Sequence, residues 1–379
     1  MMNHSQLVHF ERALRDERVL SVYLHGGAED PAARLVWRTD LDRSLRAIRR
    51  SLADATHDER ESFERSVARL EGLLAPYVDG LSAQAWVAFI TDGVARSAEG
   101  LPVPVPTLAS WGTGICVAPY MRAIKATRPV VVAVVDARAA RVYRFQFGAL
   151  DLVTTIHAHA IIGAPAHMGD APRSGFHPGV RGETARDAAQ RAHATGTERM
   201  LREAALVVTA HASGSIIVGG NSRIASRFRE MLGGSTPHRV LQLESLGVHA
   251  SEAEIAELAG VGASALRDAA DLRAISDIID GDAARDRATV GLEATRHALD
   301  MRAVRELYVT PRFIEERLPD AEDAVRKALE QGATVETVAR VVAGQLDLHG
   351  GIAARLRFRA AEAPAPTRMD DDPPARASA

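Results

Sequence analysis

The chain has 379 residues, of which 46% are hydrophobic and 25% are charged, and its formal net charge is -3 at pH 7. This composition is typical of a folded globular protein of two or three domains, and it excludes a bulk polycation that would bind nucleic acid over its whole surface. The single cysteine, Cys116, excludes an internal disulfide and a zinc site made of several cysteines. No apolar run has the length of a membrane span and the first residues lack the layout of a signal peptide, so we expect a cytoplasmic protein without membrane contact.

Residues 1–126 are predicted to form an N-terminal domain that contains both helices and strands (α/β). Within it, the helices and strands are expected to follow the α+β arrangement. Helical apolar spacing predicts three helices, at residues 7–15, 32–52 and 59–77. Strands are predicted at residues 19–24, 85–91 and 93–99. Asp92 and Gly93 favour a hairpin turn between the last two strands.

The second of these helices carries a cluster of arginines between Arg34 and Arg50. The cluster could face RNA, but Asp40 and Asp42 lie among the arginines. Mixed charge is usual on an exposed helix, so a solvated face is the preferred interpretation.

Residues 127–246 are predicted to form a middle domain, a mixed sheet covered by helices. Strands are predicted at residues 128–137, 139–147 and 215–218, and a polar helix at residues 185–205. The continuous apolar run 130–135 indicates a strand buried on both faces. The loop 161–184 is rich in Gly, Pro and His and is longer than compact domains usually contain, which predicts either a functional or a disordered segment.

Two strand ends in this domain could carry chemistry. Asp136 follows the first strand, where catalytic carboxylates often lie, but the sequence offers no set of carboxylates that would share a metal with it, so a turn aspartate is the preferred interpretation. The sequence Gly-Gly-Asn-Ser at residues 219–222 could bind phosphate at a helix N-terminus. Because the full dinucleotide fingerprint is absent, a close turn with Asn221 or Ser222 as the helix cap is preferred.

Histidines are frequent in and around the long loop, and His157 and His159 have a spacing that permits a shared metal. The other spacings match no zinc pattern, so we expect no metal and no cofactor.

The last third of the chain is predicted to hold a helical linker at residues 247–285, with a capping box from Ser251 to Glu254. Residues 286–360 alternate between helices and strands, which predicts a small α/β/α sandwich. Helices are expected at residues 289–299 and 320–330, and strands at 303–310, 333–338 and 351–358. The tail 361–379 is rich in Ala, Pro and Asp and is expected to be disordered.

Several stretches resemble the archaeo-eukaryotic peptide-chain release factors and their rescue relative Pelota. Four of these stretches are similar to the C-terminal domain of the family: residues 290–299, 303–309, 333–336 and 348–358. Residues 131–147 and 215–232 resemble its ribonuclease H-like middle domain, and the order of domains is the same. The resemblance is strongest to the bacterial branch of the family, whose members include the ribosome-hibernation factor Balon.

One departure from the family limits what the resemblance implies. Release factors carry Gly-Gly-Gln in the middle-domain loop, whereas residues 179–185 read Gly-Val-Arg-Gly-Glu-Thr-Ala and the chain contains no Gly-Gly-Gln. Glu183 is a weak base for ester hydrolysis, because an unperturbed carboxylate has a pKa near 4.3. The Asn-Ile-Lys-Ser stop-codon motif is absent as well. The sequence therefore does not support peptide release, and no catalytic residue is assigned.

The resemblance implies a ribosome-associated factor for rescue or hibernation. We expect such a factor to act by binding rather than as an enzyme. Its partners would be the ribosome, through ribosomal RNA and the tRNA site, and a translational GTPase. The RNA-binding residues would lie on the loop: Arg173, Arg181, Gly182, Glu183 and Arg186. Simple solvent exposure of these arginines beside acidic neighbours remains equally open. The alternative function is a hydrolase that acts on peptidyl-tRNA, or on RNA through Asp136 and a metal.

Overall fold

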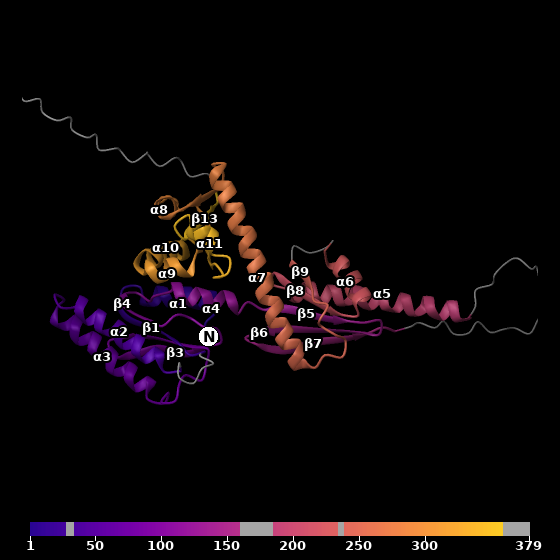
Figure 1. Cartoon of the computed structure of the whole chain (residues 1–379), viewed down its shortest axis with the longest axis horizontal. Coiled ribbons are helices and arrows are strands. Elements are labelled where there is room, and N and C mark those ends of the chain that lie inside the picture. The colour runs from indigo at the N-terminus through magenta and orange to yellow at the C-terminus, as the bar shows by residue number, and fades with distance from the viewer. Residues whose placement is uncertain (28–33, 160–184, 234–238, 359–379) are drawn as a thin grey trace, which may run out of the picture.

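The computed structural model describes residues 1–27, 34–159, 185–233 and 239–358. Within these ranges the chain is a mixed α/β protein with three separate sheets, each covered by helices (Figure 1). The predicted fold class is confirmed. The predicted loop 161–184 and the predicted disordered tail 361–379 lie outside the described residues.

The N-terminal sheet is fully antiparallel, with the order β3-β2-β1-β4. Its strands are β1 (Arg18–His25), β2 (Ala85–Thr91), β3 (Val94–Leu101) and β4 (Leu108–Thr113). The helices of this region are α1 (His4–Leu14), α2 (Val36–Ser51), α3 (His57–Leu74) and α4 (Ala118–Ala126). The strand β4 and the helix α4 were not predicted.

Both faces of β1, an inner strand of the N-terminal sheet, are buried, and its successive side chains point to opposite faces. Leu20 and Val22 of β1 pack with α2 and α3. Val19 and Tyr23 point the other way, into a core that contains residues of α1 and α4. This second core continues into the C-terminal sheet, so that α1 and α4 lie between the two (Figure 1).

The central sheet has five strands in the order β7-β6-β5-β8-β9. They are β5 (Val130–Val135), β6 (Ala139–Gln146), β7 (Ala149–His157), β8 (Ser215–Gly220) and β9 (Arg239–Gln242). The first three form an antiparallel meander, and β8 and β9 run parallel to β5. The predicted mixed sheet is confirmed, and β5 is buried along its whole length as the apolar run predicted.

Helices cover the central sheet on both faces. On one face lie α5 (Ala185–His211) and α6 (Ser222–Gly233), which pack on Val131, Ala133 and Val135. On the other face lies the first half of α7 (Glu252–Ala283), which packs on Val132 and Val134.

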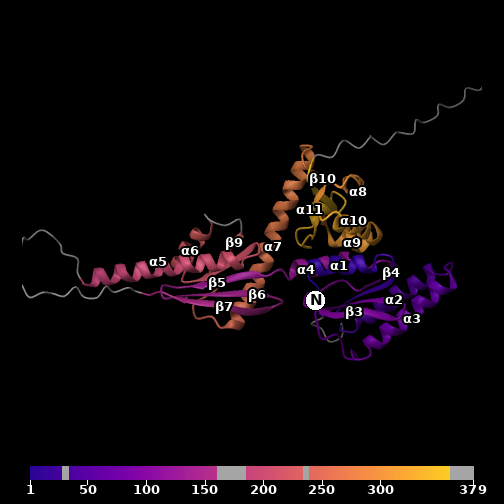
Figure 2. The ribbon, with the colours of Figure 1, turned by 180° about the vertical axis from the view of Figure 1, so that it is seen from behind.

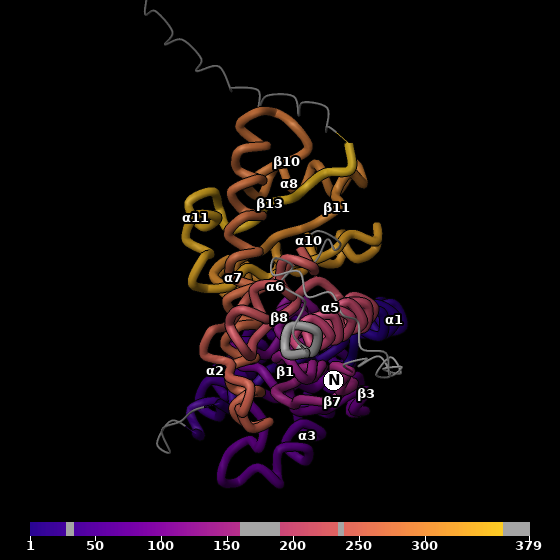
Figure 3. Tube along the Cα trace, turned by 90° about the vertical axis from the view of Figure 1, so that its right-hand side faces the viewer, coloured from indigo at the N-terminus to yellow at the C-terminus, as the bar shows by residue number. Residues whose placement is uncertain are grey.

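Helix α7 also forms part of the C-terminal unit. Its predicted capping box is present, since Ser251 accepts a hydrogen bond from the backbone N–H of Glu254 and the side chain of Glu254 accepts one from the backbone N–H of Ser251. Beyond the central sheet, Ile275 and Ile278 pack against the C-terminal sheet. One continuous helix therefore joins the two sheets (Figures 2 and 3).

The C-terminal sheet has the order β10-β13-β11-β12. Its strands are β10 (Ala288–Val290), β11 (Val304–Val309), β12 (Thr334–Thr337) and β13 (Ile352–Leu356). Its helices are α8 (Leu292–Asp300), α9 (Pro311–Glu316), α10 (Leu318–Glu330) and α11 (Gly344–Asp347). Residues of α8, α9 and α10 share one core with the sheet, and residues of α7 and α11 share the other, which is the predicted α/β/α sandwich.

One element prediction is corrected by the structure. Residues 288–290, partly assigned to a helix, form β10, because Thr289 and Val290 pair with β13 and Gly291, at a φ of +85°, separates the strand from α8. The strands β7 and β9 were not predicted as elements. Both lie at sheet edges, where β7 is largely exposed, so neither has the apolar run of a buried strand. Within the described ranges, no helix is both long and apolar enough to cross a bilayer.

Candidate functional site at the end of the central sheet

The described residues that precede and follow the predicted loop belong to β7 and α5, which meet at one end of the central sheet. At this end β5 and β8 finish at Val135 and Gly220, and β7 finishes at His157, which is paired with the first residue of β6. The helix α5 begins at Ala185 and runs back over the sheet. Among its described side chains, the first buried hydrophobic ones are Met200 and Leu201, and its N-terminal part projects beyond the sheet (Figures 1 and 2).

Thr197 fixes the point at which α5 leaves the sheet. Its Oγ1 donates to the carbonyl oxygen of Ala137, in the turn between β5 and β6, at 2.8 Å. The same hydroxyl oxygen lies 3.0 Å from the carbonyl oxygen of His193, one turn earlier in the helix. The projecting part of α5 is therefore attached at its base to the turn that follows β5.

The five predicted RNA-binding residues are not tested by the structure. Arg173, Arg181, Gly182 and Glu183 lie outside the described residues. Arg186 lies in the first turn of α5, but its side chain is also outside the described part.

Asp136 is a turn aspartate, in agreement with the preferred interpretation. Its Oδ1 accepts hydrogen bonds from the backbone N–H groups of Arg138 at 2.6 Å and Ala139 at 2.7 Å. This is the local bonding by which aspartate stabilises a turn. In the described ranges, no three His, Cys, Asp or Glu residues converge as metal ligands would, and this covers His157 and His159.

The Gly-Gly-Asn-Ser segment is a close strand-to-helix turn, as predicted. Gly220 has a φ of +108°, and a Cβ at this position would lie 2.0 Å from the carbonyl oxygen of Val135. The backbone N–H of Asn221 donates to that same oxygen at 2.9 Å. The side-chain Oδ1 of Asn221 accepts from the N–H of Ile224 at 3.3 Å, which caps α6.

Three arginines that no sequence pattern singled out lie at this end of the sheet. Arg138 lies in the turn after β5, Arg199 lies just after Thr197 on α5, and Arg223 lies in the first turn of α6. All three are exposed, and none has a side-chain hydrogen bond or ion pair with another described residue. By contrast, Arg202 and Arg227 are both paired with Glu198. We name Arg138, Arg199 and Arg223 the sheet-end arginines.

The arginines of α2 are arranged differently. Arg43 pairs with Asp40 at 2.9 Å and Arg46 with Asp42 at 3.7 Å. Arg49 pairs with Glu64 of α3 at 2.8 Å. The predicted neutralised, solvated face is confirmed.

Residues 116–260 match the model of the bacterial archaeo-eukaryotic release factor family 10. Over these residues the chain is similar to the bacterial archaeo-eukaryotic release factors. The match begins just before α4, includes the whole central sheet with α5 and α6, and ends inside α7. The sheet-end arginines and helix α5 lie within these matched residues, which we name the release-factor domain for their similarity to the family. The predicted resemblance to the bacterial branch is confirmed, and the closer link to Balon stays a prediction.

Solved structures of release factors and of Pelota are similar to the chain at low identity. Pelota of Archaeoglobus fulgidus is 19% identical, with 72% of this chain and 79% of that chain covered and a TM-score of 0.35. Dom34 of S. cerevisiae is 12% identical, with coverages of 73% and 81% and a TM-score of 0.43. The archaeal termination factor aRF1 is 17% identical, with coverages of 94% and 99% and a TM-score of 0.25. No curated protein matches the chain.

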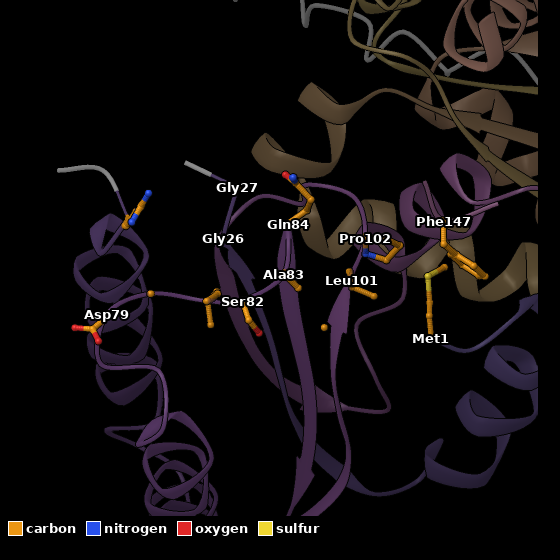
Figure 4. A pocket seen from close by; sticks show the side chains of 14 residues that line it. Met1, Gly26, Gly27, Asp79, Ser82, Ala83, Gln84, Leu101, Pro102 and Phe147 are labelled. Carbon is orange, nitrogen blue, oxygen red and sulfur yellow. The ribbon is translucent and has the colours of Figure 1, made fainter. Parts of the chain in front are cut away.

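A wide cavity of about 1000 Å³ lies apart from the sheet end, beside the N-terminal sheet (Figure 4). Asp79 and Ser82 lie toward one side of it and Phe147, from the β6–β7 turn, lies at the other. Its lining contains no predicted site residue and no sheet-end arginine. The cavity is therefore separate from the candidate site of the release-factor domain.

Proposed function

We propose that the protein is a translation factor-like protein that associates with the ribosome in rescue or hibernation and does not release peptide. The observation that carries the proposal is that the sheet-end arginines, which have no hydrogen-bond or ion-pair partner within the described part of the chain, lie at the end of the sheet from which helix α5 projects. Exposed guanidinium groups without a protein partner can contact RNA phosphates without reading sequence. The predicted loop arginines Arg173, Arg181 and Arg186 would add further phosphate contacts.

Two further points support the binding role over an enzymatic one. The chain contains no Gly-Gly-Gln, the tripeptide that the resemblance associates with ester hydrolysis. Asp136, the residue of the alternative hydrolase, uses its Oδ1 in two backbone hydrogen bonds of its own turn. A cytoplasmic location and a translational GTPase as a second partner form part of the proposal, and the sequence resemblance supports both.

Co-sedimentation with ribosomes over a series of salt concentrations tests the proposal. The variant R138A/R199A/R223A removes the sheet-end arginines, and R43A/R46A/R50A removes the same charge from α2 as a matched control. Each lost phosphate contact lowers the salt dependence of log K by about 0.7 to 0.9. We expect the first variant to bind more weakly, with a smaller salt slope, and the control to bind like the wild type.

The loop prediction is tested in the same assay with R173A/R181A/R186A, for which we expect a further loss of affinity. If ribosomes fail to retain the wild-type protein at low ionic strength, the proposed function is wrong. Release of a labelled peptide from ribosomes distinguishes the alternative. We expect none, and efficient release that is lost in Glu183→Ala would establish the hydrolase instead.

A further inference from the structure

A second polar site lies where the three parts of the molecule meet. It is a cavity of about 290 Å³, lined by residues of α4, of α7 and of the segment that follows β12. The side chains that matter are Arg122 and Lys125 from α4, Arg267 and Asp271 from α7, and Arg340 from the third segment. We name this space the junction cavity. It is not part of the sheet-end site, and no predicted site residue lines it.

Some charges around the junction cavity are already compensated. Lys125 Nζ lies 2.5 Å from Asp271 Oδ1 and 3.3 Å from Glu336 Oε2. The other oxygen of Asp271 accepts from the backbone N–H of Ala339 at 2.9 Å. Arg340, which is largely exposed, pairs with Glu315 at 2.6 Å. These ion pairs and this hydrogen bond link the elements that line the cavity, and the charges that form them are balanced without a ligand.

Arg122 and Arg267 are not compensated in this way. Both are partly buried, and neither makes a side-chain hydrogen bond or ion pair within the part of the chain that the structure describes. Burial lowers the pKa of both guanidinium groups, with the charge of Arg340 adding to the effect at Arg122. A charge taken out of water without a partner is costly, so both arginines would gain from an anion in the cavity.

Asp268, an acidic residue of the cavity wall, offsets only part of the effect of burial on Arg267. It follows Arg267 on α7, and no hydrogen bond or ion pair joins the two side chains. Burial raises the pKa of Asp268, and the charge of Asp271 raises it further. At Arg267 the effect of burial exceeds the opposing effects of Asp268 and Asp271, so its guanidinium group still lacks a bonded partner.

We propose that the junction cavity binds a small phosphorylated ligand through Arg122 and Arg267. Two guanidinium groups present planar pairs of N–H donors, which match the oxygens of a phosphate group better than they match a monovalent halide. The volume is at the lower limit of small-molecule pockets, which suits inorganic phosphate or a phosphomonoester and not an RNA helix. Because the walls come from α4, α7 and the segment after β12, the bound ligand would fasten these three elements together.

The test measures binding of inorganic phosphate and of ribose 5-phosphate to the full chain by calorimetry, together with the shift in Tm, at constant ionic strength set with chloride. The variants are Arg122→Met and Arg267→Met, which keep much of the length of the side chain and remove its charge. Arg273→Met is the matched control, since Arg273 is an exposed arginine on the same helix that does not line the cavity.

We expect the Tm of the wild type and of the control to rise with phosphate concentration, as for any ligand that binds only the folded state. Binding and the Tm shift should be lost in both cavity variants, while their Tm without phosphate equals or exceeds that of the wild type, because a partly buried charge without a bonded partner has been removed. Ribose 5-phosphate binding more tightly than phosphate would identify a phosphomonoester as the ligand class. Equal phosphate affinity in all four proteins, or binding of an RNA oligonucleotide alone, would overturn the proposal.

Discussion

Lys125 of α4 and Asp271 of α7 form a buried ion pair, with 2.5 Å between Nζ and Oδ1. Lys125 also donates to the carbonyl oxygen of Thr337, at the end of β12. Asp271 accepts from the N–H of Ala339, just beyond it. The pair therefore joins α4, α7 and the C-terminal sheet at one point, and its removal should affect all three.

Asp271→Ala should lower the free energy of unfolding by at most about 3 to 5 kcal/mol, because Lys125 stays buried and keeps only its more distant counter-ion, Glu336. The control is Asp277→Ala on the same helix, where an exposed carboxylate pairs with Arg355 at 2.8 Å. That variant should cost at most about 1 kcal/mol. Urea denaturation followed by circular dichroism compares the two, and equal costs would contradict the buried-pair interpretation. Adding Lys125→Met to Asp271→Ala should recover part of the loss, since no buried charge is then left unpaired.

Glu322 of α10 joins the C-terminal unit to the start of α4. Its fully buried carboxylate accepts hydrogen bonds from the backbone N–H groups of Val117 at 2.8 Å and Ala118 at 2.6 Å. The Sγ of Cys116 lies 3.2 Å from its Oε1. Burial raises the pKa of Glu322 above its ordinary value of 4.5, and this effect exceeds the opposite effect of the N–H donors.

The raised pKa of Glu322 makes stability depend on pH in a defined direction. Below pH 4.5 the carboxyl is protonated in the folded and the unfolded chain. As the pH rises above that value the unfolded chain ionises first, so the wild type loses stability until the pH passes the folded pKa. Each unit of the increase in pKa corresponds to about 1.4 kcal/mol.

The measurement is the difference in unfolding free energy between the wild type and Glu322→Gln from pH 4 to pH 8, since glutamine does not titrate. This difference should change in favour of the variant as the pH rises. A pH-independent difference would show that the carboxyl does not titrate in this range.

Gly220→Ala should be strongly destabilising. At Gly220 the positive φ is unfavourable to alanine, and the added Cβ would meet the carbonyl oxygen of Val135 in the backbone of a buried strand. Gly148 is the matched control, because its φ is +76° and a Cβ added there would meet no atom within 4 Å. We expect Gly220→Ala to cost about 1 to 3 kcal/mol more than Gly148→Ala in urea denaturation. Similar costs for the two variants would mean that the turn adjusts to a side chain.

Thr197→Ala should loosen the base of the projecting helix. The variant loses the hydrogen bond to Ala137, worth about 0.5 to 1.5 kcal/mol. Thr209→Ala is the control, because the hydroxyl of Thr209 bonds within α5, to the carbonyl oxygen of Ala205. Hydrogen exchange of the amides near residue 197 should accelerate in the first variant and not in the second. Unchanged exchange would show that the helix is held by its packing at Met200 and beyond.

Much of the fold could be predicted from local patterns. The apolar run of β5, the helical spacing of α3 and the capping box at Ser251 each identified an element. The sequence could not identify β7, because a strand at an exposed sheet edge needs no apolar run. The boundaries proposed at residues 126, 246 and 285 stay predictions. These boundaries do not indicate that α7 packs against two sheets. Nor do they indicate that the N-terminal and C-terminal sheets share a core.

The candidate site was predictable only in part. The sequence alone identified the long loop, the missing Gly-Gly-Gln and the turn roles of Asp136 and Asn221, because each depends on residues close together in the chain. The tertiary structure decided which arginines gather at the sheet end and which polar residues become buried. Lys125, Asp271, Glu322 and Arg267 are of residue types usually found at the surface, and they are enclosed only because α4, α7 and the C-terminal unit pack together there. Burial of a charge depends on neighbours that are distant in sequence. The spacing of residues along the chain does not predict which distant residues these will be.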